Sequence, residues 1–145
     1  MRAVIQRVKK ASVKIDNEII NEIGKGLLVL LAIHKDDKKE NLIKMADKIV
    51  NLRIFEDKNQ KMNLSVLNSG GEILVVSQFT LYGDCKKGNR PNFMNSASPE
   101  KAENYYNKFI DLLKTKNLPV KTGKFGAMME VSLINNGPVT IILDF

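Results

Sequence analysis

Cysteine and histidine are almost missing from this chain of 145 residues, which holds one of each and no tryptophan. The single Cys85 cannot form an intrachain disulfide, which fits a reducing compartment such as the cytoplasm. One histidine and one cysteine also cannot assemble a standard zinc centre. No glycine-rich phosphate loop is present, because Gly70-Gly71 is too short for one. The sequence therefore predicts an activity without a metal or another cofactor.

Long apolar runs are lacking as well. The longest, residues 27–33, is far too short to span a bilayer, and the N-terminal stretch has charges among its apolar residues, unlike a signal peptide. We therefore expect a soluble, cytoplasmic protein without membrane association. The 23 basic and 16 acidic side chains leave a net charge of +7. This charge suits an anionic partner such as RNA, but it serves surface solvation equally well.

The hydrophobic pattern predicts one α/β domain over residues 1–145, with a mainly antiparallel sheet and two main helices. A turn is expected at Asp16-Asn17. Residues 26–33 are apolar on both faces and predict a buried central strand. In all, strands are expected where residues alternate or where a short run is apolar throughout: 2–8, 11–15, 18–23, 26–33 and 72–79.

Two stretches have the three- and four-residue apolar spacing of amphipathic helices. The second of them begins at Ser98-Pro99, an N-cap residue followed by proline at the first helical position. The buried stripe of the first is expected to be Leu42, Ile43, Ala46, Ile49 and Val50. The buried stripe of the second is expected to be Ala102, Tyr105, Tyr106, Phe109, Ile110 and Leu113.

The segment Asn135-Asn136-Gly137-Pro138 lies between two alternating runs, 129–134 and 139–143. Asn-Gly in this setting predicts a β-hairpin. The peptide bond before a proline is the one kind that is readily cis, and a Gly-Pro tip could present its backbone carbonyls to a ligand. Taken alone, however, Pro138 is explained more simply as the start of an edge strand.

The polar segment 77–84 ends the apolar strand expected at 72–79. Its hydroxyls, amide and aromatic rings either cap a turn or face a ligand. Backbone N–H groups at such a strand end can form an oxyanion hole for an ester carbonyl. His34 and Cys85 have no partner base or nucleophile in the pattern, so neither is expected to be catalytic.

Two motifs together, Ser77-Gln78-Phe79-Thr80-Leu81 and Asn135-Asn136-Gly137-Pro138-Val139-Thr140, resemble the signatures of the D-aminoacyl-tRNA deacylases, the D-tyrosyl-tRNA deacylase family. Asn136 stands where the family often has aspartate, but either residue suits a turn. Further similar segments run nearly end to end: 1–8, 82–84, 86–88, 90–91 and 123–129. The resemblance implies the family's fold, with a barrel-like core, over residues 1–145.

The resemblance also implies an enzyme, a carboxylic ester hydrolase acting on aminoacyl-tRNA. It would cleave the ester between a D-amino acid and the 3′-terminal adenosine of tRNA, reject L-aminoacyl-tRNA, and clear glycine mischarged on tRNA-Ala, as proofreading in translation. It would act as a homodimer with active sites at the subunit interface, without a metal or cofactor.

The family's site residues can be carried over onto matching positions. The resemblance makes Ser77, Gln78, Phe79 and Thr80 the catalytic strand end. It makes Gly137 and Pro138, joined by a cis bond, a chiral filter that reaches into the other subunit's site. Phe125 and Met129 would line the terminal-adenosine pocket.

Three questions stay open at this point. The attack on the ester is driven either by Thr80, which has no base beside it, or by water aided by the vicinal hydroxyl of the tRNA ribose. The chain could instead be a basic RNA-binding module without chemistry, with Lys86, Lys87 and Arg90 as phosphate contacts. The Gly137-Pro138 segment could also be a dimer contact only.

Overall fold

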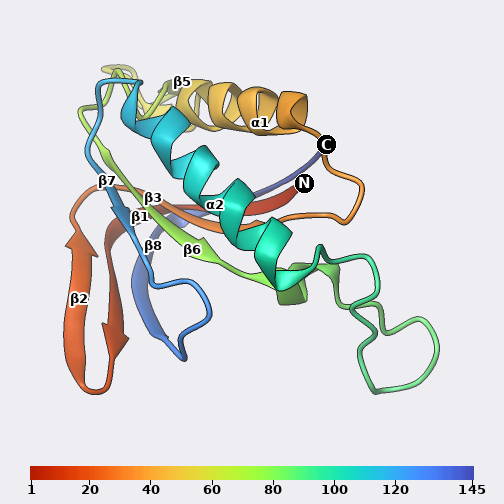
Figure 1. The fold of residues 1–145 in the computed structure, drawn as a ribbon. Helices are drawn as coiled ribbons and strands as arrows, with labels where there is room; N and C mark the ends of the chain where they lie inside the picture. Colours follow the sequence, from red (N-terminus) through yellow and green to blue (C-terminus); the bar gives the residue numbers. More distant parts are fainter.

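The computed structural model describes residues 1–145, and most of its strands join one curved, mixed sheet in the order β2-β1-β3-β6-β7, with β8 also paired to β1 (Figure 1). The sheet consists of β1 (Arg2–Ile15), β2 (Glu18–Ile23), β3 (Gly26–Ala32), β6 (Glu72–Ser77), β7 (Val120–Thr122) and β8 (Glu130–Asp144). The other elements are α1 (Lys39–Asn51), β4 (Phe55–Glu56), β5 (Met62–Leu64), the 3-10 turn η1 (Phe79–Tyr82) and α2 (Pro99–Lys114). This arrangement confirms the predicted α/β fold with two main helices.

Strand β1 is the centre of the sheet, because it pairs antiparallel with β2, β3 and β8. It joins the two strands predicted at 2–8 and 11–15 into one. The pairs β3–β6 and β6–β7 are parallel. Parallel neighbours need a crossover, and here the connection from β3 to β6 contains α1 while that from β6 to β7 contains α2. The expected buried strand at 26–33 is β3, which lies between β1 and β6.

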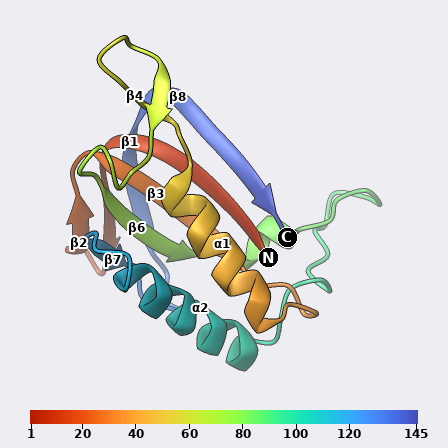
Figure 2. The same ribbon diagram turned by 90° about the horizontal axis from the view of Figure 1, so that it is seen from above.

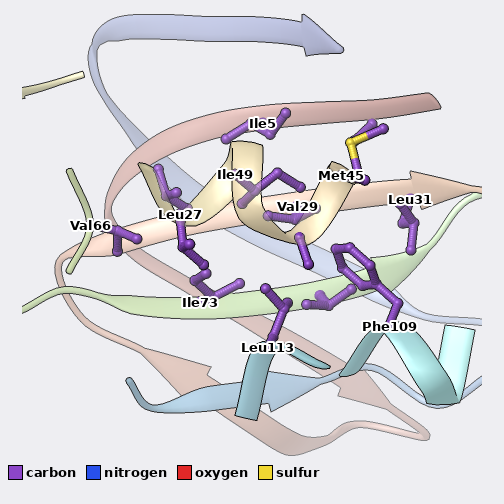
Figure 3. Packing of buried hydrophobic residues seen from close by; sticks show 14 of the residues in the cluster. Ile5, Leu27, Val29, Leu31, Met45, Ile49, Val66, Ile73, Phe109 and Leu113 are labelled. Atoms are coloured by element: carbon purple, nitrogen blue, oxygen red, sulfur yellow. The ribbon is translucent and has the colours of Figure 1, made fainter. Parts of the chain in front are cut away.

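The two helices cover the same face of the sheet, as the view from above shows (Figure 2). The core lies between these layers. In Figure 3, Val29 and Leu31 of the sheet meet Ile49 of α1 and Phe109 of α2. Neither helix is both long and apolar enough to cross a membrane.

The buried stripe of α1 differs from the predicted one at two positions, because Met45 takes the place of Ile43. Met45 is fully buried, whereas Ile43 is 51% exposed. Starting from Leu42, helical spacing places residues 45, 46, 49 and 50 on one face, so Ile43 lies beside the stripe and not on it. The predicted N-cap of α2 is confirmed, because the Ser98 side chain accepts a hydrogen bond from the Lys101 backbone N–H.

The predicted hairpin at Asn136-Gly137 is wrong. Strand β8 runs without interruption through this segment, and both its halves pair with β1. Thr140 pairs with Gln6 and Asn135 pairs with Val8, so residues 136–139 stand opposite Arg7 alone. A long partner strand lets both halves continue in one ladder, and the surplus residues form a bulge instead of a turn. The Gly137-Pro138 bond is cis, as the family resemblance implied.

Candidate active site

The polar strand end predicted at 77–84 lies where β6 stops. The chain leaves the sheet at Gln78, whose backbone N–H still donates to the Leu31 carbonyl at 2.8 Å. It then enters η1, in which Phe79 and Thr80 are exposed. The Gln78 side-chain amide donates to the Thr80 hydroxyl, and the Ser96 hydroxyl donates to the Phe79 carbonyl at 3.1 Å. Two side-chain hydrogen bonds therefore hold this turn, and its side chains line a hollow in the surface.

That hollow is a mostly apolar cavity of about 750 Å³ beside η1. Small-molecule sites in proteins typically occupy roughly 300–1,000 Å³. Six of the residues singled out from the sequence line this one cavity: Ser77, Gln78, Phe79, Thr80, Phe125 and Met129. The structure thus brings together the end of β6 and the loop before β8, which are far apart in the sequence.

Close packing positions the aromatic and sulfur-bearing walls of the cavity. The Phe79 ring meets the Phe93 ring edge-on, with centroids 5.2 Å apart. The Phe125 ring leans on Tyr106 of α2, with centroids 5.9 Å apart. A Cβ on Gly123 would lie 2.7 Å from the Met129 sulfur, so the absent side chain makes room for Met129. Phe125 and Met129 are therefore supported by the core and by the backbone.

No ionisable side chain lines the cavity. Its polar side chains are the hydroxyls of Ser77, Thr80 and Ser96 and the amide of Gln78. His34, the single histidine, lies elsewhere and packs edge-on against Tyr82, with ring centroids 5.1 Å apart. A side-chain nucleophile here would have no general base to take its proton. The arrangement can position an ester and stabilise charge with backbone N–H groups.

Gly137 and Pro138 do not line this cavity in their own chain. Both are exposed in the bulge of β8. The Asn135 side chain fastens the bulge, because its Oδ1 accepts from the Val139 backbone N–H at 2.8 Å and its Nδ2 lies 3.3 Å from the Val139 carbonyl. Within one chain, the two signature motifs therefore lie apart.

Arg7 supports the same bulge from below and is only 4% exposed. Its Nε donates to the Asn136 carbonyl at 2.8 Å, and its Nη1 donates to the Ile54 carbonyl at 2.5 Å. The Glu56 carboxylate lies 3.7 Å from Nη2. A buried guanidinium needs such acceptors, and here most of them are backbone carbonyls.

The sequence model described as D-Tyr-tRNA(Tyr) deacylase matches residues 4–144 of the chain. The chain belongs to this family. Curated relatives named D-aminoacyl-tRNA deacylase include one from Thermosipho africanus, 57% identical over 99% of this chain and 97% of the relative. Another, from Clostridium beijerinckii, is 60% identical with the same coverage of both chains.

Two solved structures are similar to this member of the deacylase family. One, named "c-Myc DNA Unwinding Element Binding Protein", is 47% identical, covers 100% of this chain and 99% of its own, and superposes with a TM-score of 0.96. The other, described as a "probable eukaryotic D-amino acid tRNA deacylase", is 18% identical, with a TM-score of 0.84 over 99% of this chain and 98% of its own. The second likeness shows the fold alone.

Sequence reasoning missed several residues of the site in this deacylase-family chain. Phe93, Ser96 and Ala102 line the cavity, and Arg7 holds the bulge. The loop before α2 has no apolar period that would link it to β6. Arg7 did carry a signal, because it shares a strand face with the buried residues Ala3 and Ile5. A charge on a core face requires partners, and those partners became visible only in the structure.

Proposed function

We propose that this chain is a cytoplasmic D-aminoacyl-tRNA deacylase, acting through residues 1–145 as one domain. It hydrolyses the ester between a D-amino acid and the 3′-terminal adenosine of tRNA and releases both. The observation that carries the proposal is the single cavity in which Ser77–Thr80 meet Phe125 and Met129. Family membership supplies the substrate class, since the curated relatives are named for this activity.

The terminal adenosine occupies the apolar end of the cavity. Phe125 and Met129 supply flat and adaptable apolar surface, which suits a nucleobase because single-stranded RNA ends are bound largely by stacking. This places the ester, which is attached to the ribose of the same nucleoside, near the exposed end of η1. The catalytic strand end then consists of Ser77, Gln78, Phe79 and Thr80.

The chemistry is assisted by the substrate. The backbone N–H groups of Phe79 and Thr80 open the 3-10 turn, where N–H groups have no partner within the turn, and they bind the oxyanion. A water oxygen attacks the ester carbonyl carbon. The vicinal ribose hydroxyl relays the proton of that water to the departing ribose oxygen as the carbon–oxygen bond breaks. The absence of any ionisable side chain from the cavity supports this route over a Thr80 nucleophile.

The bulge of β8 is the chiral filter, supplied by the partner subunit of a homodimer. Gly137 and Pro138 are exposed and lie outside the cavity of their own chain, so a second copy would bring them to it. A fixed backbone placed where an L side chain would project rejects every L-amino acid alike. Glycine has no side chain to reject, so glycine mischarged on tRNA-Ala is cleaved too, which makes the enzyme a proofreader of translation.

The deciding experiment is hydrolysis of D-Tyr-tRNA, L-Tyr-tRNA and Gly-tRNA-Ala by the purified protein. Turnover of the D and glycyl esters with L-Tyr-tRNA left intact is the expected result. Cleavage of both tyrosyl enantiomers at similar rates would remove the filter from the proposal. No turnover of any ester, combined with tRNA binding, would overturn the enzyme.

A nucleic-acid-binding module without chemistry is the second candidate. The structure 47% identical to this chain is named for binding a DNA element. Lys86, Lys87 and Arg90 are exposed together in one loop, as phosphate contacts require. The intact strand end 77–80 beside a cavity favours the enzyme, because phosphate binding alone needs neither. The hydrolysis assay separates the two candidates.

A further inference from the structure

The turn η1 borders a second cavity in addition to the apolar one. Phe79 and Thr80 line the apolar cavity, whereas Tyr82 and Gly83 line a cavity of about 480 Å³. The two hollows are therefore separated by one short turn. The second is polar where the first is apolar, since it is lined mainly by charged and amide side chains.

The lining of the second cavity offers hydrogen-bond donors and acceptors that the protein leaves free. Asn95 is exposed, and only its backbone carbonyl is engaged within the chain. The Lys86 ammonium is exposed and forms no ion pair. Asp84 uses Oδ1 to accept from the Lys86 backbone N–H at 2.8 Å, which leaves Oδ2 available. Asp144, by contrast, is occupied by Arg2 at 2.5 Å.

Aromatic surface completes this cavity. The His34 ring also lines it and is held edge-on against Tyr82, with an angle of 66° between the rings. The Arg2 guanidinium carbon lies 4.9 Å from the centre of the Tyr82 ring. Single-stranded RNA bases are bound by this combination of ring or guanidinium surface with hydrogen bonds to the base edge.

We propose that this second cavity holds the cytidine that precedes the terminal adenosine of tRNA; the inference rests on the proposed function. All tRNAs end in C-C-A, so such a site serves every tRNA. Cytosine has an amino donor, which a carboxylate such as Asp84 accepts, and ring acceptors that suit the Asn95 amide. The Lys86 ammonium neutralises the phosphate that joins the two nucleosides.

The loop that contributes Asp84 and Lys86 extends the path for the RNA strand. Backbone hydrogen bonds of 2.8 and 2.9 Å between Asp84 and Asn92 close it at its base, and it projects from the body of the molecule (Figure 1). Beyond the cavity it carries Lys87 and Arg90, both exposed. Positive charge therefore continues outward from the cavity, in the direction that the preceding phosphates would follow.

The experiment measures kcat/KM for two substrates that differ by one nucleotide: the D-Tyr ester of adenosine and the D-Tyr ester of the dinucleotide CpA. The variants are Asn95→Ala and Lys86→Gln. The control is Lys44→Gln, a lysine on α1 that is also exposed. We expect the wild-type protein and Lys44→Gln to gain at least about tenfold on addition of the cytidine, as expected for hydrogen bonds to a charged group.

Asn95→Ala and Lys86→Gln should lose most of that gain and match the wild type on the adenosine ester. A D-Tyr ester of UpA should be cleaved more slowly than that of CpA by the wild type. The inference is overturned if the added cytidine gives no gain, if UpA and CpA esters react equally, or if both variants lose activity on the adenosine ester as well. Failure of the proposed function is distinct, because then no D-Tyr ester is hydrolysed.

Discussion

Thr80 carries a hydroxyl that lines the cavity and could serve as a nucleophile only with help from a base. Its hydroxyl accepts a hydrogen bond from the Gln78 amide, and no carboxylate, imidazole or amine lines the cavity around it. An amide cannot take a proton from threonine near neutral pH. A serine or threonine nucleophile ordinarily relies on an adjacent base, so Thr80 lacks the partner that would make it one.

Replacing Thr80 with alanine tests this reasoning. We expect kcat/KM of Thr80→Ala on D-Tyr-tRNA to stay within about tenfold of the wild type. The kcat/KM of the wild-type enzyme should fall at least about 100-fold on D-Tyr-tRNA that lacks the vicinal ribose hydroxyl, because that hydroxyl relays the proton. Single-turnover hydrolysis measures both. If Thr80→Ala abolishes turnover and the deoxy substrate is still cleaved, Thr80 is the nucleophile.

Gly137 has no room for a side chain in the bulge of β8. Its φ is +141°, and a Cβ would lie 2.7 Å from the Val139 Cγ2 atom and 3.1 Å from the Arg7 Nη2 atom. Gly137→Ala should therefore shift the bulge. We expect a decrease of about tenfold or more either in the rate of D-Tyr-tRNA hydrolysis or in the preference for D-Tyr-tRNA over L-Tyr-tRNA. Gly70→Ala, in the turn before β6, is the matched control, since its φ is also positive at +64° but no atom lies within 4 Å of its Cβ position. Unchanged rates on both enantiomers in Gly137→Ala would count against a filter at this position.

The cavity as a whole predicts an unusual pH dependence. Because no ionisable side chain lines it, none of its lining residues offers a catalytic acid or base near neutral pH. We expect kcat/KM on D-Tyr-tRNA to rise smoothly or stay level between about pH 6 and 8, without the bell shape of an acid–base pair. Stopped assays across this range, corrected for spontaneous ester hydrolysis, provide the measurement. A bell-shaped profile would place an essential acid and base in the site.

At the scale of elements, α1 offers a matched pair of neighbouring apolar residues. Met45 is fully buried in the core and Ile43 is half exposed. Met45→Ala should lower the free energy of unfolding by about 2–4 kcal/mol, because it leaves a cavity between α1 and the sheet. Ile43→Ala should change it by no more than about 0.5 kcal/mol. Urea denaturation measures both free energies of unfolding, which can be compared if the variants share the same m-value. Equal losses of free energy in the two variants would contradict the assigned helix face.

Regular periodicity explains which elements could be predicted. Helices α1 and α2 and strands β2, β3 and β6 follow from their apolar spacing and caps. The short strands β4, β5 and β7 have two or three residues each, too few to show a period. The hairpin prediction failed because the Asn-Gly signal is local. Whether β8 folds back or continues depends on the length of β1, which a window of residues around Gly137 does not contain.

The residues of the candidate site also divide into those that the sequence could predict and those that it could not. The strand end 77–80 was predictable, because polar residues follow an apolar run, but its meeting with Phe125 and Met129 depended on the family resemblance. Phe93, Ser96 and Arg7 could not be assigned, because their roles arise from contacts between segments distant in the sequence. Local pattern thus locates chemistry-bearing residues, while the tertiary fold decides which of them share a cavity.

At the scale of the whole molecule, the two signature motifs lie apart within one chain, and the proposed function has a second subunit bring them together. A cavity-blocked variant, Ala102→Phe, and the filter variant Gly137→Ala can be mixed to test this, since Ala102 lines the cavity and Gly137 does not. In a mixed dimer, one site combines an open cavity with an intact bulge from the partner. We therefore expect the mixture, after subunit exchange, to hydrolyse D-Tyr-tRNA with wild-type discrimination against L-Tyr-tRNA, although neither variant does so alone. Each variant taken alone through the same subunit-exchange procedure is the control. A mixture that behaves as the sum of its two components would show that the bulge does not serve the site of the other subunit.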